Sequence, residues 1–397
     1  MAGNTEVVVV GGGYAGVMAA NRLTRRDDVT VTLINPRPLF VERPRLHQRM
    51  VGSHDAVVEY REVLSARVRL VVGSVTRIDT AGRGVALAAD GTIDYDYLIY
   101  AVGSGSADRR VPGAAEFAYP VATFEEVERL RPVLAATPMT DPVTVVGAGT
   151  TGIETAAELA EPGRAVTLVC GGVLGPYLHP RARRSVARRL AGLGVRVLDG
   201  PHAKVTAVTP GAVLLGDGRE LPSRVTVWTA GFGVPDLAAR SGLSTDALGR
   251  LLTDETLTCV DDVRTVAAGD AAAPSGLPLR MSAQAAFHTG AHAADTVLSR
   301  IAGERPRPIS LGFSGQCISL GRRAGIFQFA HEDDTARGFH LGGRAGAKLK
   351  EFAGKHGRKL LVDEARKPGS HSWPKDDKRR RRLAHRGDAP ATAEPAA

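Results

Sequence analysis

The sequence predicts an α/β fold with two parallel-sheet units in one chain, each suited to binding a dinucleotide. Two segments carry this prediction, Val7–Gly16 and Val143–Gly152, which begin 136 residues apart. Each is a β-branched run that breaks into G-x-G-x-x-G and continues as an alanine-rich helical pattern. One such turn alone is a weak signal, but two in the strand–turn–helix context are a strong one. We therefore expect two Rossmann-like units and two bound dinucleotides.

Each glycine of these turns has a separate physical role. The first supplies the permissive backbone that a tight strand-to-helix turn needs, and the second lacks a Cβ, so that a pyrophosphate can approach the main chain. The third lets the helix pack close to the sheet, and the pyrophosphate sits on the free N–H groups of that helix. In this order they are Gly11, Gly13 and Gly16 in the first turn, and Gly147, Gly149 and Gly152 in the second.

The composition limits the class of protein. A chain of 397 residues is long enough for two or three domains. No apolar run approaches the length of a membrane-spanning helix, and no signal-like stretch precedes the first strand at Thr5, so we expect a cytoplasmic protein. Cys170, Cys259 and Cys317 lack paired spacing, which indicates neither a disulfide framework nor a metal site.

Further elements follow in chain order. The pattern predicts helices over 14–25, 123–136 and 282–301, and strands over 29–34, 166–169, 195–198, 225–230 and 265–268. Residues 36–50 are rich in proline and arginine and are expected to be irregular. Alternating runs over 68–100 predict a small antiparallel meander. From residue 306 the pattern shifts to short strands and then to a basic helical stretch.

The charge of the chain is concentrated at its C-terminal end. The net charge is +9, and residues 337–397 hold 16 Lys/Arg against 7 Asp/Glu, whereas the rest of the chain is balanced. This predicts an acidic surface partner for the C-terminal end alone. Residues 368–397, with a Lys-Arg-Arg-Arg-Arg block and Pro/Ala repeats, are expected to form a disordered basic tail. No fold-level motif indicates nucleic acid as a partner.

The basic helical stretch has an apolar face. Lysines flank this face, a pattern typical of a helix lying on anionic lipid, which would place the protein peripherally on the inner face of the membrane. The alternatives are a helix packed on its own domain and a helix at a homodimer interface. The apolar residues at helical spacing are Ala345, Leu349, Phe352, Ala353 and Leu360.

Several motifs, in the right order, resemble the FAD/NAD(P)-dependent pyridine nucleotide-disulfide oxidoreductase superfamily over about residues 5–330. The first glycine turn resembles its FAD site and the second its NAD(P) site. Ala101–Gly103, Trp228–Gly231 and Ala268–Asp270 resemble its further motifs. The resemblance implies a discontinuous FAD domain over 1–115 and 250–305, an NAD(P) domain over 116–249 inserted between them, and a small α+β C-terminal domain over 306–367.

Within this superfamily the chain is most similar to type II NADH:quinone dehydrogenases and apoptosis-inducing-factor-like oxidoreductases. The signals are Phe40, Glu154, Trp228–Gly231 and Ser282–Ala286. The resemblance implies that NAD(P)H passes a hydride to FAD and that the electrons then reach a quinone. Two alternatives stay open: an NAD(P)H-dependent reductase of a ferredoxin-like protein, and an apoptosis-inducing-factor-like redox sensor with slow turnover.

The resemblance also places site residues. Glu154, near the nicotinamide, and Gln284, beside the flavin and the acceptor, are the catalytic candidates, although a first-turn helix glutamate and a surface glutamine would look the same. Asp270 can accept hydrogen bonds from ribityl hydroxyls, or it can cap a helix. Asn35, 24 residues after Gly11, stands where such a unit usually has an acid for the adenosine ribose, or it is a turn residue. The expected cofactor-binding residues are Gly11, Gly13, Tyr14, Ala15, Gly16, Asn35, Val75, Ala101, Gly103, Gly147, Gly149, Gly152, Gly231, Gly269 and Asp270.

Three further features bear on the chemistry. Arg43, Arg45 and His47 either line the flavin or are solvated loop charges. In the second unit the position that usually holds an acid for the adenosine ribose falls near Cys170. No carboxylate stands there, so we expect NADPH to be accepted at least partly. Residues 36–60 contain no cysteine, unlike the superfamily's disulfide reductases, so electrons should leave directly from the flavin.

Overall fold

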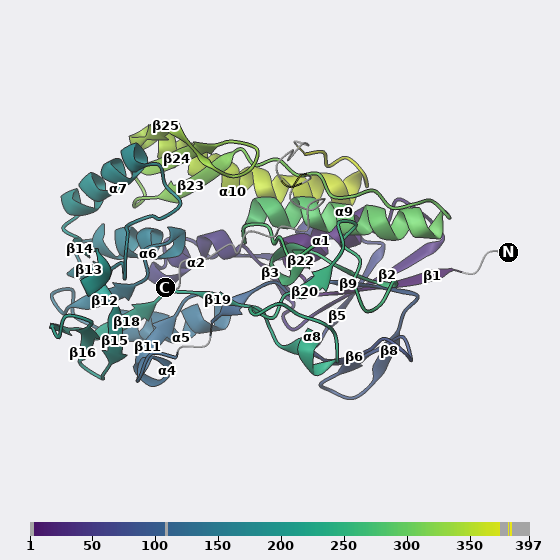
Figure 1. Ribbon diagram of the computed structural model, residues 1–397, viewed down its shortest axis with the longest axis horizontal. Helices are drawn as coiled ribbons and strands as arrows, with labels where there is room; N and C mark the ends of the chain where they lie inside the picture. The colour runs from purple at the N-terminus through teal and green to yellow at the C-terminus, as the bar shows by residue number, and fades with distance from the viewer. Residues whose placement is uncertain (1–3, 108–109, 374–379, 381, 383–397) are drawn as a thin grey trace.

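Two five-stranded parallel sheets form the centres of the two larger parts of the molecule (Figure 1). The computed structural model describes residues 4–107, 110–373, 380 and 382. The first sheet has the order β21-β9-β1-β2-β5. Its strands are β1 (Thr5–Val10), β2 (Val29–Asn35), β5 (Val68–Val72), β9 (Tyr97–Tyr100) and β21 (Thr265–Ala267). Because β21 pairs with β9, this sheet is assembled from two distant stretches of the chain.

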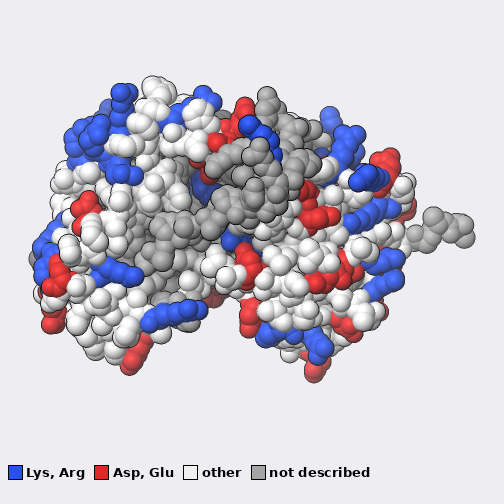
Figure 2. Space-filling model, in the orientation of Figure 1, with Lys and Arg blue, Asp and Glu red and all other residues white. Residues whose placement is uncertain are grey.

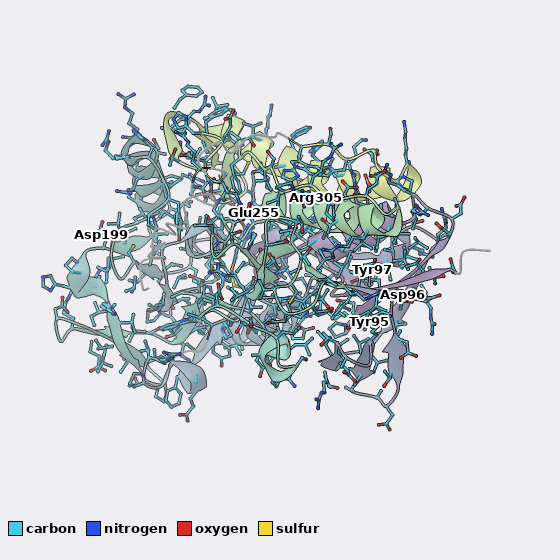
Figure 3. All side chains as sticks on the ribbon, turned by 45° about the vertical axis from the view of Figure 1, so that its right-hand side comes forward. Tyr95, Asp96, Tyr97, Asp199, Glu255 and Arg305 are labelled. Atoms are coloured by element: carbon cyan, nitrogen blue, oxygen red, sulfur yellow. The ribbon has the colours of Figure 1, made fainter. Side chains whose placement is uncertain are left out.

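The first sheet is fastened by local contacts and by helices. Asp96, just before β9 (Figure 3), accepts a hydrogen bond from the backbone N–H of Glu6 on β1 at 2.9 Å. Helix α1 (Tyr14–Leu23) follows the first glycine turn and packs against α9 (Ala283–Ile301), in the same hydrophobic cluster as Val7 and Val9 of β1. The alanines of both helices permit this close packing.

The second sheet has the order β11-β18-β12-β13-β14. Its strands are β11 (Ala118–Pro120), β12 (Val143–Val146), β13 (Val166–Val169), β14 (Arg196–Leu198) and β18 (Val225–Trp228). Its helices are α5 (Phe124–Ala136), α6 (Thr150–Ala160) and α7 (Pro180–Gly192). Helix α5 begins at a capping box of Thr123 and Glu126, whose side chains satisfy each other's backbone N–H groups. The prediction of an α/β fold with two Rossmann-like units is confirmed, and the exact domain limits remain predictions.

Smaller antiparallel sheets complete the fold. The meander expected over 68–100 is β6 (Val75–Asp79), β7 (Gly84–Leu87) and β8 (Thr92–Asp94). A second three-stranded sheet holds β15 (Val205–Val208), β16 (Ala212–Leu215) and β17 (Glu220–Pro222). The third is β23 (Gly315–Ser319), β24 (Gly325–Ala330) and β25 (Ala336–Gly342), followed directly by the long helix α10 (Gly343–Arg366) along the top of Figure 1. None of the described helices is long and apolar enough to span a membrane.

Residues 36–50 are more regular than their composition predicts. They form β3 (Leu39–Val41), which pairs with β4 (Val57–Glu59), then a 3₁₀ turn, and then α2 (Leu46–Val51). The helix is possible because Leu46–Val51 holds neither glycine nor proline, and it ends at Gly52, which has a φ of 77°. Its buried Leu46 and Met50 pack in the hydrophobic cluster of the second sheet, so α2 joins the two units.

Helix α10 packs through glycines. A Cβ at Gly346 would lie 2.2 Å from the carbonyl oxygen of Gly325, and a Cβ at Gly357 would lie 3.1 Å from Cζ of Phe287. These glycines therefore allow close approach to β24 and α9. Elsewhere on the helix Ala345 and Ala353 are exposed, and Phe352 is 63% exposed. The helix is thus packed on its own molecule and keeps an outer apolar face.

The segment after α10 is ordered by one carboxylate. Glu364 is fully buried and accepts hydrogen bonds from the backbone N–H groups of Gly369 (2.6 Å) and His371 (2.7 Å), while pairing with Arg22 of α1 at 3.2 Å. Trp373 donates its indole N–H to the carbonyl of Ser310. The prediction of disorder is therefore wrong for residues 368–373. Apart from Arg380 and Arg382, the remainder of the predicted tail lies outside the described residues.

Removal of the Glu364 carboxylate should destabilise the fold. Glu364→Ala leaves Asp295 as the remaining carboxylate partner of the buried Arg22 and removes the acceptor of the Gly369 and His371 N–H groups, so we expect a loss of about 3 kcal/mol in the free energy of unfolding. Asp363→Ala removes only the more exposed pair with Lys359 and should cost less than about 1 kcal/mol. Urea unfolding followed by circular dichroism measures both, and equal losses would contradict this role of Glu364.

Candidate active site

The two glycine turns open on one cavity of about 2120 Å³ between the two parallel sheets. Its wall is formed at the carboxyl ends of strands of both sheets, where ligands of such folds bind. All the predicted site residues except Gly16 and Gly152 line it. The lining members are Gly11, Gly13, Tyr14, Ala15, Asn35, Val75, Ala101, Gly103, Gly147, Gly149, Glu154, Gly231, Gly269, Asp270 and Gln284.

The first glycine turn has the geometry its sequence predicts. Gly11 has a φ of +105°, and a Cβ there would lie 2.2 Å from the carbonyl oxygen of Ala101. A Cβ at Gly16 would lie 1.8 Å from the carbonyl oxygen of Gly11, which explains why Gly16 is buried and off the cavity wall. Around Gly13, by contrast, no atom lies within 4 Å of a Cβ position, and no side chain caps α1. Open space therefore adjoins a helix N-terminus that attracts anions.

The second turn repeats this arrangement. Gly147 has a φ of +108°, and a Cβ at Gly152 would lie 1.8 Å from the carbonyl oxygen of Gly147. A Cβ at Gly149 meets nothing within 4 Å, and α6 also begins without a side-chain cap. Both helix N-termini thus offer free N–H groups to a phosphate in the same cavity.

Asp270 lies in a polar cluster on the first unit. Its Oδ2 accepts a hydrogen bond from Oγ of Ser104 at 2.7 Å and lies 3.6 Å from Nη1 of Arg43, which also donates to Ser104 at 3.1 Å. Asp270 follows β21 and lies within a short 3₁₀ turn, so it does not cap an α-helix. Arg43 is accordingly a wall residue of the cavity rather than a solvated loop charge.

Asn35 uses both ends of its amide within the protein. Its Oδ1 accepts from the backbone N–H of Gly12 at 3.0 Å, and its Nδ2 donates to the carbonyl of Arg37 at 2.8 Å. The residue is 5% exposed and fastens the end of β2 to the first glycine turn. These bonds are those of a turn residue, and a contact with ribose remains a prediction.

Glu154 joins three parts of the chain. Its carboxylate pairs with Nζ of Lys350 on α10 at 2.6 Å, accepts from the backbone N–H of Ser319 at 2.8 Å, and lies 3.6 Å from Nδ1 of His47 on α2. It is 4% exposed and lies in the interior of α6, beyond the first turn. No sequence signal singles out Lys350, which is there only one cation of a basic helix.

The other predicted polar residues near Glu154 are also buried. Arg45 is 6% exposed and pairs with Glu351 of α10 at 3.0 Å. Burial lowers the pKa of His47 to about 4, and its buried Nε2 has no hydrogen-bond partner among the described residues. Cys317 lies on the cavity wall, where burial raises its pKa to about 11 and keeps the thiol protonated.

An apolar arm of the cavity lies between α9 and α10. The ring of Phe287 lies 4.9 Å from that of Tyr14, beside the first glycine turn, and faces Gly357 of α10. Gln284, one turn earlier on α9, is half-buried and lies 3.5 Å from Oγ of Ser314, so it is a wall residue rather than a surface glutamine. The arm is further lined by Leu349, Phe352, Ala353, Leu360 and His371.

Among residues 4–107, 110–373, 380 and 382, no group of three or more His, Cys, Asp or Glu side chains could hold a metal ion.

The family model for pyridine nucleotide-disulphide oxidoreductases matches residues 5–290. The chain belongs to the pyridine nucleotide-disulphide oxidoreductase family. Its open helix N-termini and shared cavity are the features that such an oxidoreductase requires.

Similar proteins place this oxidoreductase within the family. It is 34% identical to the NADH dehydrogenase-like protein Rv1812c of Mycobacterium tuberculosis over 296 residues, 68% of this chain and 73% of that protein. It is 30% identical to the type II NADH:quinone oxidoreductase Ndh of the same organism over 346 residues, 76% of this chain and 74% of that protein. The structure of NDH2 from Plasmodium falciparum in complex with NADH shares the fold, with a TM-score of 0.74, 15% identity, and coverage of 94% of this chain and 99% of that chain.

The buried His47 predicts acid lability. Its pKa is about 4 in the folded protein and about 6.5 in an unfolded chain, so below pH 6.5 the unfolded state binds more protons. The free energy of unfolding should therefore fall as the pH is lowered from about 6.5 towards about 4. His47→Gln should make the free energy of unfolding depend less on pH. At pH 5 the loss of unfolding free energy caused by His47 amounts to about 2 kcal/mol. Urea unfolding at pH 7 and pH 5 measures the difference.

The exposed His331 supplies a matched control. His331→Gln should leave the pH dependence of unfolding as it is in the wild type. If His47→Gln gives the wild-type slope as well, the folded protein holds a proton on His47 and the argument from burial is wrong.

Proposed function

We propose that this oxidoreductase binds FAD at the first glycine turn and NAD(P)H at the second, takes a hydride from NAD(P)H onto the flavin, and passes the electrons to a quinone. The observation that carries the proposal is that both turns, distant in sequence, open on a single cavity. A shared cavity is what direct hydride transfer between two nucleotides needs, because the reacting atoms must come within about 3–3.5 Å.

The residues of the first unit fit FAD. The free N–H groups at the start of α1 suit its pyrophosphate, and the open space at Gly13 lets that group reach the backbone. Asp270 and Ser104 would bind ribityl hydroxyls, with Arg43 holding the carboxylate in place. When bound, FAD would supply an isoalloxazine ring that accepts a hydride and gives up electrons to the acceptor.

Glu154 and Lys350 would orient the reacting partners. The ion pair is nearly buried and lies on the cavity wall, so its field acts with little screening by water. Glu154 would face the nicotinamide and Gln284 the flavin and acceptor. With no thiol relay in residues 36–60, nothing in this segment would intercept the electrons.

The apolar arm supports a quinone as the acceptor. Its lining by Tyr14, Phe287, Gly357 and Leu360 suits a flat, apolar ring, and it lies beside the first glycine turn. Relatives named type II NADH:quinone oxidoreductases point the same way.

The second unit should accept NADPH at least partly. Cys170 directly follows β13, where an acid would bind the adenosine ribose, and it lines the cavity. Burial and, after it, Asp199 raise the pKa of the Cys170 thiol to about 12, so the thiol adds no negative charge. Asp199 itself, at the left edge of Figure 3, is exposed after β14. It does not line the cavity. Little would therefore repel a 2′-phosphate.

A steady-state assay tests the proposal. The purified protein should oxidise NADH with a short-chain quinone as acceptor, and it should oxidise NADPH with a comparable kcat/KM. The kcat should be about 1 s⁻¹ or higher, as is typical of enzymes. Reduction of a ferredoxin but not of the quinone would favour the protein acceptor. A long-lived reduced flavin with neither acceptor would favour a redox sensor, and a large preference for NADH would contradict the coenzyme argument.

The outer face of α10 is proposed to contact anionic lipid peripherally. Exposed Phe352 is flanked by exposed Lys348, Lys355 and Lys359. In Figure 2 further Lys and Arg side chains gather at the upper left, over α7 and β25, next to the start of α10. Vesicles containing anionic lipid should carry the protein upward in flotation at low salt, and Phe352→Glu should weaken this. Absence of binding at low salt, or a stable homodimer that covers this face, would overturn the idea.

A further inference from the structure

Two histidines from distant parts of the chain form a hydrogen-bonded pair on the cavity wall. Nδ1 of His288, on α9, lies 3.0 Å from Nε2 of His371, in the segment after α10. The two rings are stacked at an interplanar angle of 14°, and both stack on Trp373. Both residues line the cavity, although His288 is only 6% and His371 only 5% exposed.

The surroundings of the pair keep it neutral. Burial lowers the pKa of His288 to about 3, with a smaller contribution from His371. Burial also lowers the pKa of His371, where the nearby charges oppose one another: Glu364 of α10 raises it, and Arg22 of α1 and His356 of α10 lower it. A proton that arrives at such a pair is held weakly and is readily passed on.

The pair has one nitrogen to take up a proton and another to release it. Nδ1 of His371 is buried and has no hydrogen-bond partner among the described residues. Nε2 of His288 is the remaining nitrogen of the other ring. A proton can therefore bind at Nδ1 of His371, the shared proton can shift from Nε2 of His371 to Nδ1 of His288, and a proton can leave from Nε2 of His288.

The proposed reaction needs such a step. Reduction of a quinone to a quinol takes two electrons and two protons. NAD(P)H supplies a hydride, which is two electrons and one proton, so each turnover draws one further proton from solvent. His288 lies one helical turn after Gln284 on α9 and next to Phe287 in the apolar arm, where this acceptor would bind.

We propose that His288 and His371 deliver this solvent proton to the quinone. His288 donates the proton to the quinone, and His371 positions His288 and reprotonates it. The proposal rests on the proposed function, because only an acceptor that binds protons needs the pair. Exposed Ser372, beside His371 and also on the cavity wall, marks the side open to solvent.

Acceptors that differ in proton demand test the proposal. His288→Gln and His371→Gln keep a polar side chain but cannot relay a proton. The kcat with a short-chain quinone should fall about tenfold or more in both variants. With ferricyanide, which takes electrons alone, kcat and the KM for NAD(P)H should stay within about twofold, since general acid catalysis has no part in that reaction. The fall with quinone should be larger at high pH, where solvent protons are scarce.

His292 supplies the matched control. It is a buried histidine one turn further along α9, it has an unpartnered Nε2, and it does not line the cavity. His292→Gln should leave the ratio of quinone to ferricyanide turnover unchanged. If a variant fails to fold, the wild type still decides, because its solvent deuterium isotope effect should be larger with quinone than with ferricyanide.

The outcomes separate the two proposals. Wild-type reduction of ferricyanide without reduction of quinone removes the proposed function and this proposal with it. Wild-type quinone turnover with full activity in both histidine variants, an equal fall with both acceptors, or an equal isotope effect overturns the histidine proposal alone. An equal fall would assign the pair a merely structural role.

Discussion

The close approach of backbone at the two glycine turns is the constraint on which the rest of this structure depends. A Cβ at Gly11 would lie 2.2 Å from the carbonyl oxygen of Ala101, which follows β9. A Cβ at Gly147 would lie 2.7 Å from Oγ1 of Thr229. Only glycine lets strand, turn and helix meet this closely at these φ values. The result is a pair of helix N-termini whose N–H groups stay free of side-chain caps and open on the same space.

Packing between the units then gives the cavity its chemistry. Helix α2 packs Leu46 and Met50 into the core of the second unit and places His47 beside Glu154, and α10 brings Lys350 to the same carboxylate. The same helix, through Gly357, closes an apolar arm against Phe287. Charge lies on one part of the wall and apolar surface on another, an arrangement suited to a charged coenzyme and an apolar acceptor.

Local signals made the two turns, the two sheets and most helices predictable from sequence, because a glycine turn or a capping box depends on neighbouring residues. Contacts between distant residues were not predictable in this way. Lys350 lies 196 positions from Glu154, and His371 lies 83 from His288. The segment after α10 looked disordered because its composition is polar, whereas a single buried carboxylate, Glu364, orders it. The burial of Arg45 and the place of Arg43 on the cavity wall likewise followed from partners on other elements.

Anaerobic reduction of the purified protein, followed through its visible absorption, tests the central claim most directly. The account predicts a bound flavin whose absorption bleaches on addition of NADH or NADPH. It also predicts that Gly149→Val, whose side chain would enter the open space at the second turn, retains the flavin and bleaches far more slowly. Absence of any flavin would contradict the account from the first glycine turn onward, and equally fast bleaching in Gly149→Val would contradict the assignment of the second turn.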